Sequence, residues 1–130
     1  MFGMKRSLIR EESYSFALNI IRLYRGLVSR NEFVISRQVL KSGTSIGANV
    51  EEALAGQSRA DFLSKMSIAS KEARETNYWL RLLRDSGLSL ESEVLEILSD
   101  SERILKMLTA IVKTTKHGSG EMNPKPKTKN

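Results

Sequence analysis

The sequence predicts an all-α protein, an up-down-up-down four-helix bundle. Apolar residues recur with helical periodicity over four long segments. Both prolines, Pro124 and Pro126, lie near the C-terminus, so proline interrupts none of these segments. Helices joined by short turns favour antiparallel neighbours, whereas a DNA-binding helix-turn-helix needs shorter, crossed helices. The short breaks between the segments lie at 30–32, 56–58 and 86–89.

The first two segments each show one apolar face. In residues 11–29 this face is Ala17, Ile20, Ile21, Tyr24, Leu27 and Val28. In residues 37–55, which Ser36 is expected to cap, it is Val39, Gly43, Ile46, Val50 and Leu54. Gly43 and Gly47 each cost about 1 kcal/mol of helix propensity relative to alanine. Close packing against another helix is the simplest reason for both glycines.

The third and fourth segments are longer. Ser58 is expected to cap the helix over residues 59–85, and Gly87 offers a left-handed cap at its end. Its predicted core face is Phe62, Met66, Ala69, Ala73, Thr76, Leu80 and Leu83. Residues 90–115 repeat isoleucine or leucine every seven positions, at Leu90, Ile97, Ile104 and Ile111. The predicted organisation is a bundle over residues 1–117 and a disordered basic tail over 118–130.

The third segment has a second apolar side around Tyr78 and Trp79. A helix in a monomeric bundle needs no such side, and Tyr and Trp are enriched in interface hot spots. An interface with another copy or a partner is therefore expected, the alternative being that Trp79 packs at the bundle edge. The residues predicted to form an oligomer interface are Thr44, Ala48, Glu52, Ile68, Lys71, Glu75, Tyr78, Trp79 and Leu82.

The net charge of +6 is uneven along the chain. Residues 1–10 carry +3, residues 113–130 carry +4, and the remaining residues, 11–112, carry −1. Flexible basic ends attract polyanions, although they can also serve only to keep a protein soluble. Residues 22–41 add five basic residues against one acid. The residues predicted to bind nucleic acid are Lys5, Arg6, Arg10, Arg22, Arg25, Arg37, Lys41, Lys113 and Lys116.

A further basic group lies on the third segment. Lys71, Arg74 and Arg81 flank Tyr78, an arrangement that can track phosphates and stack bases. The alternative is that these are ordinary solvated charges of a helix surface.

Several classes of function have no support in the sequence. The chain has no cysteine and one histidine, His117, which excludes thiolate and multi-histidine metal sites. The spacing of acidic, serine and lysine residues picks out no catalytic group, so we expect neither an enzyme nor a bound cofactor or metal. Residues 42–49 (SGTSIGAN) lack the phosphate-loop pattern. No signal peptide or membrane span is visible in the sequence, so we expect a cytoplasmic protein that does not enter a membrane.

Two stretches resemble a known family. SRQVLKSGTSIGANVEEA (36–53) and DFLSKMSIASKEARETNYWLRLL (61–83) are similar to the bacterial four-helix-bundle proteins named for intervening sequences in large-subunit ribosomal RNA genes. The accessory variability determinant of diversity-generating retroelements is a more distant relative. The resemblance implies a ring-like homopentamer without enzymatic activity. For the retroelement relatives it also implies binding of nucleic acid and of a reverse transcriptase.

Two functions follow from these observations. The first is a homo-oligomeric bundle that binds RNA or DNA, as an accessory factor to a reverse transcriptase or an rRNA insertion. The second is a scaffold or adaptor with a protein partner only, whose basic ends serve solubility.

Overall fold

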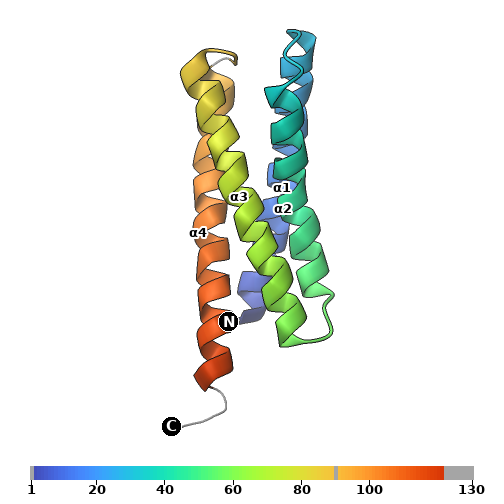
Figure 1. Ribbon diagram of the computed structural model, residues 1–130, viewed down its shortest axis with the longest axis vertical. Coiled ribbons are helices and arrows are strands. Elements are labelled where there is room, and N and C mark those ends of the chain that lie inside the picture. Colours follow the sequence, from blue (N-terminus) through green and yellow to red (C-terminus); the bar gives the residue numbers. More distant parts are fainter. Residues whose placement is uncertain (1, 90, 122–130) are drawn as a thin grey trace.

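The computed structural model of the chain describes residues 2–89 and 91–121, which form four helices (Figure 1). They are α1 (Phe2–Ser29), α2 (Ile35–Leu54), α3 (Arg59–Ser86) and α4 (Glu91–Glu121). Successive helices run antiparallel and pack against each other, and α4 returns to pack against α1 (Figure 1). The predicted all-α up-down-up-down bundle is confirmed.

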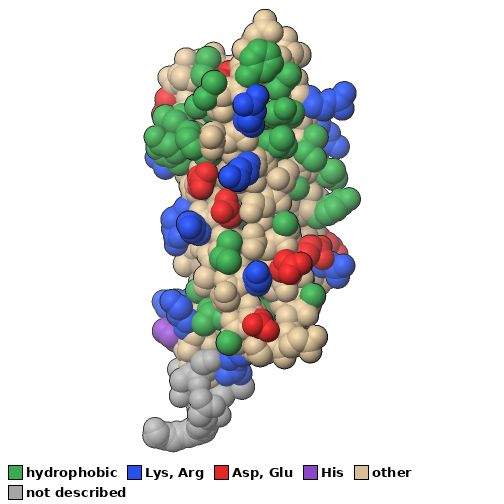
Figure 2. All heavy atoms as spheres, turned by 45° about the vertical axis from the view of Figure 1, so that its right-hand side comes forward, with side chains coloured by type: hydrophobic (Ala, Val, Ile, Leu, Met, Phe, Trp, Pro, Cys, Tyr) green, Lys and Arg blue, Asp and Glu red, His purple; other side chains and the backbone are tan. Residues whose placement is uncertain are grey.

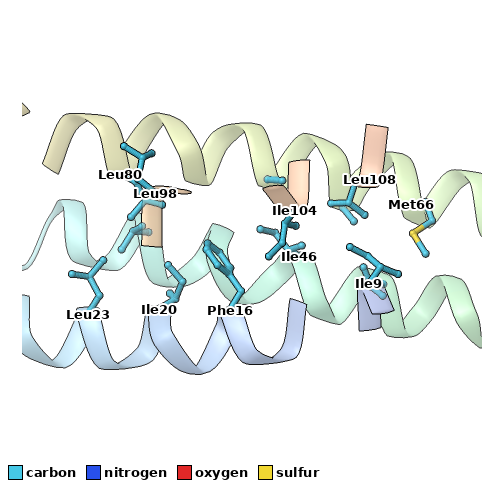
Figure 3. Close-up of a cluster of buried hydrophobic side chains, with 14 of the residues drawn as sticks. Ile9, Phe16, Ile20, Leu23, Ile46, Met66, Leu80, Leu98, Ile104 and Leu108 are labelled. Carbon is cyan, nitrogen blue, oxygen red and sulfur yellow. The ribbon is translucent and has the colours of Figure 1, made fainter. Parts of the chain in front are cut away.

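One cluster of buried apolar side chains fills the space between the helices (Figure 3). Every residue predicted for the core face of the third helix is buried, including the polar Thr76. The predicted face of the second helix is also buried except for Leu54, which is half-buried. In α4, Ile104 and Ile111 are buried and Ile97 is half-buried, while Leu90 lies outside the described residues.

The apolar face predicted for the first helix is only half right. The buried row of α1 consists of Ile9, Phe16, Ile20, Leu23 and Leu27. Ile21, in contrast, is 39% exposed. Ala17, Tyr24 and Val28 are half-buried. Apolar residues of this helix cover a wider sector than one core face needs, so the predicted stripe mixed core positions with positions on its outer flank.

The basic N-terminal end is part of a helix, contrary to the expectation of a flexible segment. α1 begins at Phe2, well before the predicted start near residue 11. Ile9 is fully buried and ties this first part of the helix to the core. The guanidinium of Arg6 lies 4.6 Å from the centre of the Phe62 ring. These contacts supply packing that the charge pattern alone does not reveal.

The C-terminal helix is also longer than expected. α4 continues past residue 115 to Glu121 and so occupies the first part of the predicted tail. Residues 122–130, with three of the five C-terminal lysines, lie outside the described residues.

Glu32 caps the start of α2, not Ser36 as predicted. Its carboxylate accepts hydrogen bonds from the backbone N–H groups of Val34, Ile35 and Ser36, at 3.2, 3.1 and 2.7 Å. The hydroxyl of Ser36 is buried and has no hydrogen-bond partner within the described residues. The longer side chain of Glu32 reaches the unpaired N–H groups of the first helical turn from outside the helix. A cap from the shorter Ser36 side chain is therefore not needed.

The two caps predicted for α3 are confirmed, whereas the hydroxyl of Ser89, the residue expected to cap α4, makes no hydrogen bond within the described residues. The Ser58 hydroxyl accepts a hydrogen bond from the Asp61 N–H at 3.1 Å, and Gly87 ends α3 with a left-handed φ of 78°. Asn31, also left-handed with φ 66°, ends α1. Hydrogen bonds from Asn31 to Val28 and from Glu32 to Leu27 complete a Schellman motif there.

Small and polar residues set the spacing between helices. A β-carbon added at Gly43 would lie 2.8 Å from Cγ1 of Ile20, and one at Gly47 would lie 3.3 Å from the carbonyl oxygen of Ser13. The close helix packing predicted from these glycines is therefore present, and the helix that approaches is α1.

Two polar contacts, one buried and one half-buried, fix the position of α3. The Thr76 and Ser42 hydroxyls lie 2.9 Å apart between α3 and α2. On the other side of α3, the Asn77 side-chain amide donates to the Ser101 hydroxyl of α4 at 3.0 Å. These hydrogen bonds form only when α3 has one position and rotation relative to α2 and α4. They therefore also determine which residues α3 presents on its outer face.

Candidate nucleic-acid and assembly surfaces

The residues predicted to bind nucleic acid do not form one surface. Arg25, Arg37 and Lys41 are exposed at the end of the bundle where α1 meets α2. Lys113 and Lys116 are exposed at the opposite end, in the last turns of α4 (Figure 1). A polyanion that contacts both groups must therefore run along the bundle or meet them on different copies.

Three further predicted residues already have partners within the chain. Arg10 forms an ion pair with Glu51 at 3.2 Å, and Arg22 donates to the side chain of Asn19 at 2.7 Å. Arg6 lies over Phe62, as described above. Exposed ion pairs are worth at most about 1 kcal/mol, so Arg10 can exchange its partner for a phosphate at little cost. Nothing is described of the Lys5 side chain.

Lys113 and Lys116 lie beside a hollow of about 210 Å³ between α3 and α4. The other polar residues around it are Ser70, Arg74, Thr109 and His117. Sequence reasoning placed Arg74 on the flank of Tyr78 and did not bring it next to the lysines of α4. The proximity of Arg74 to these lysines depends on which helix packs beside α3, and helical periodicity alone does not predict which helix that is.

Arg6 belongs to a second hollow, of about 550 Å³, near both ends of the chain. The turn between α2 and α3 forms one wall, with Ser58 and Arg59, and α4 forms another, with Thr114 and Thr115. This is a second concave surface with basic side chains, and no sequence motif pointed to it.

The outer face of α3 exposes much of the apolar surface predicted for an interface. Ile68, Tyr78 and Leu82 are 37%, 47% and 37% exposed. Trp79 is half-buried against the core, and its indole N–H donates to Glu75 at 3.1 Å. The Arg81 guanidinium lies 5.8 Å from the centre of the Tyr78 ring. Trp79 thus contributes to the bundle itself, while its neighbours remain open to a partner.

Thr44 and Ala48 line a different, largely apolar hollow of about 320 Å³ between α1 and α2. Tyr14 and Ala17 form its α1 side. Lys71 and Glu52, also predicted for the interface, are exposed. The predicted interface residues are thus divided between the α1–α2 side and the outer face of α3.

Sequence reasoning missed a second exposed apolar face on α1. Tyr14, Leu18 and Ile21 are 64%, 40% and 39% exposed. The signal was present in the sequence, because the apolar stripe predicted for this helix was wider than a core face needs.

Figure 2 shows hydrophobic side chains gathered in the upper half of the face that it presents, and the histidine beside Lys or Arg side chains at its lower edge.

Paired charges cluster near the α3–α4 connection and along the α1–α4 side. A hydrogen bond from Arg84 to Asp85 lowers the pKa of the Asp85 carboxyl. Hydrogen bonds to Glu12 and Asp100 raise the pKa of Arg103. Because these ion pairs are exposed and therefore weak, they hold the two arginines back from a polyanion only slightly.

The described residues offer neither a cluster of metal ligands nor a membrane-spanning helix. Within residues 2–89 and 91–121, no group of three or more histidine or acidic side chains could hold a metal ion. No helix in this part of the chain has the length and apolar character needed to cross a bilayer.

The comparison with known families decides the relationship of this chain. The family model described as 23S rRNA-intervening sequence protein matches residues 5–110. The chain belongs to this family. The 23S rRNA-intervening sequence protein fold is also seen in a crystal structure of a protein of unknown function from the S23 ribosomal protein family of Bacteroides thetaiotaomicron VPI-5482. That protein is 48% identical, with a TM-score of 0.81 over 85% of this chain and 99% of the other. No curated protein matches this member of the intervening-sequence family.

Proposed function

We propose that this protein is a non-enzymatic, homo-oligomeric bundle that binds nucleic acid. The observation that carries the proposal is a set of exposed cations without an acidic partner in the part of the chain that the structure describes. They are Arg25, Arg37, Lys41, Arg74, Lys113 and Lys116. Unpaired cations at both ends of a bundle can neutralise phosphates without first breaking internal ion pairs.

A salt titration tests nucleic-acid binding. The affinity of the full chain for a labelled RNA is measured at increasing salt, starting from about 50 mM. Counterion release predicts a linear fall of log K with log salt, with a slope of about −0.7 for each phosphate contacted on a single strand. Absence of binding at the lowest salt, or an affinity that salt does not change, contradicts the proposal.

The exposed apolar face of α3 supports the homo-oligomeric part. The surface around Tyr78 and Leu82 combines aromatic and aliphatic groups with charged neighbours, as protein interfaces do. The resemblance to pentameric relatives makes five the expected number of copies. A reverse transcriptase or an rRNA insertion as the partner, and a cytoplasmic location, belong to the proposal on the same ground.

Sedimentation of paired variants tests the interface. Tyr78→Ala combined with Leu82→Ala is expected to lower the sedimenting mass while the helical circular dichroism persists. These two side chains are exposed, so their truncation spares the core better than a change at Trp79. The control is Leu88→Ala with Leu95→Ala, which removes side chains that are each 45% exposed elsewhere. An unchanged mass for the first variant, or an equal fall for both, contradicts the assigned interface.

A protein-only scaffold is the second candidate, and the exposed Tyr14, Leu18 and Ile21 favour it. Under this alternative, deletion of residues 118–130 leaves partner binding intact, and RNA binds weakly at every salt concentration.

A further inference from the structure

The hollow between α3 and α4 combines features that suit one ligand. Ser70 and Arg74 form its α3 side, and Thr109, Lys113, Lys116 and His117 form the polar part of its α4 side. No acidic side chain lines it. Its volume of about 210 Å³ equals that of about seven water molecules at ~30 Å³ each, enough for a phosphate group with a few waters.

Ser70 is the unusual member of this group. It is only 5% exposed, yet its hydroxyl makes no hydrogen bond to any residue that the structure describes. Several other buried hydroxyls of the bundle donate to a carbonyl of the preceding turn, as those of Ser42 and Thr115 do to Gln38 and Ile111. Because no protein group engages this hydroxyl and the residue lines the hollow, the Ser70 hydroxyl is left to bond whatever occupies the hollow.

The cations supply the second requirement for an anion. Arg74, Lys113 and Lys116 are exposed and unpaired, so their charges act on the hollow without a competing carboxylate in its lining. Arginine matches phosphate with a fixed fork of N–H donors, and lysine acts on it as a point charge.

We propose that this hollow binds one phosphate group. The Ser70 and Thr109 hydroxyls donate hydrogen bonds to its oxygens, and Arg74, Lys113 and Lys116 balance its charge. The site rests on the proposed function for the source of that group, the backbone of a bound nucleic acid. Free inorganic phosphate has the same chemistry, and the experiment separates the two sources.

The first arm uses inorganic phosphate alone. Amide resonances of the isotope-labelled full chain are followed by NMR as phosphate is added, with chloride at matched ionic strength as the blank. Saturable shifts are expected around Ser70 and Lys113. Ser70→Ala is expected to weaken phosphate binding about tenfold, because the lost hydrogen bond is to a charged group. Ser64→Ala, an exposed serine of the same helix, is the matched control and should change nothing.

The second arm uses a labelled single-stranded RNA in a buffer without phosphate. Lys113→Gln with Lys116→Gln is expected to reduce the salt slope by about 0.7, because the one phosphate contact in the hollow is lost. In the phosphate arm, the double lysine variant should lose the amide shifts. The control, Arg37→Gln with Lys41→Gln, removes the same amount of charge at the far end of the bundle and should retain them. Circular dichroism of every variant checks that the bundle is folded.

The outcomes separate the two proposals. Phosphate shifts together with weaker RNA binding by Ser70→Ala support the site and its nucleic-acid source. Phosphate shifts without RNA binding by the original chain support the site and contradict the proposed function. RNA binding that neither Ser70→Ala nor the lysine pair changes overturns the site and leaves the proposed function standing. Absence of phosphate shifts around Ser70 overturns the site as well.

Discussion

Replacing Gly43 with alanine tests how the structure explains the close approach of α1 and α2. The added methyl would lie 2.8 and 2.9 Å from Cγ1 and Cγ2 of Ile20, closer than carbon atoms approach without displacement. Ile20 is fully buried, and its branch at Cβ limits its rotamers, so it cannot swing away. Overpacking of this kind costs about 1–3 kcal/mol, and the gain in helix propensity offsets about 1 kcal/mol. The expected result is a net loss of about 1 kcal/mol of unfolding free energy.

The same substitution at Gly26 is the matched control. Its nearest neighbour would be the Glu93 carboxylate at 3.5 Å, an ordinary contact. Gly26→Ala should therefore keep the helix-propensity gain and stabilise the protein by about 0.5–1 kcal/mol. The two variants should differ in sign.

Denaturant unfolding followed by far-UV circular dichroism gives both values, at one protein concentration because assembly affects apparent stability. Adding Ile20→Ala to Gly43→Ala should show a coupling of about 1 kcal/mol, because the clashing atoms are gone. Equal stabilisation by the two glycine replacements would refute the steric reasoning.

Two further predictions concern single side chains. Glu32→Ala should destabilise the protein by about 1 kcal/mol through loss of the α2 cap, whereas Ser36→Ala, which removes a hydroxyl without a hydrogen bond, should cost nothing measurable in the same unfolding assay. Arg84→Gln should raise the pKa of Asp85 toward its ordinary value in an NMR titration, and Arg81→Gln should raise it less. Because the folded pKa of Asp85 is lowered, its pairing contributes stability above the unfolded pKa and is lost as the pH falls through the folded one.

The fold was predictable because its signals are local. Apolar periodicity, Ser58 and Gly87 each act within one or two helical turns, and the structure confirms them. The wide apolar stripe of α1 misled the prediction, because position on a helix wheel does not say which flank a neighbouring helix covers. Glu32 was missed as a cap because its reach across a turn depends on the turn geometry.

The candidate surfaces were less predictable. The sequence separates acids from bases along the chain, yet it does not say which basic residues acquire partners. Arg10 and Glu51 are far apart in sequence and form an ion pair only after α1 and α2 pack together. The grouping of Arg74 with Lys113 likewise depends on α4 lying beside α3. Neither contact can be predicted from the spacing of residues along the sequence.

Sedimentation velocity with a labelled RNA tests the central proposal most directly, because one run reports both assembly and binding. At about 50 mM salt, we expect the RNA to co-sediment with a protein species several times the 14.6 kDa of a single chain, and high salt to release it. A chain that sediments as a monomer, or RNA that sediments alone at low salt, would contradict the account.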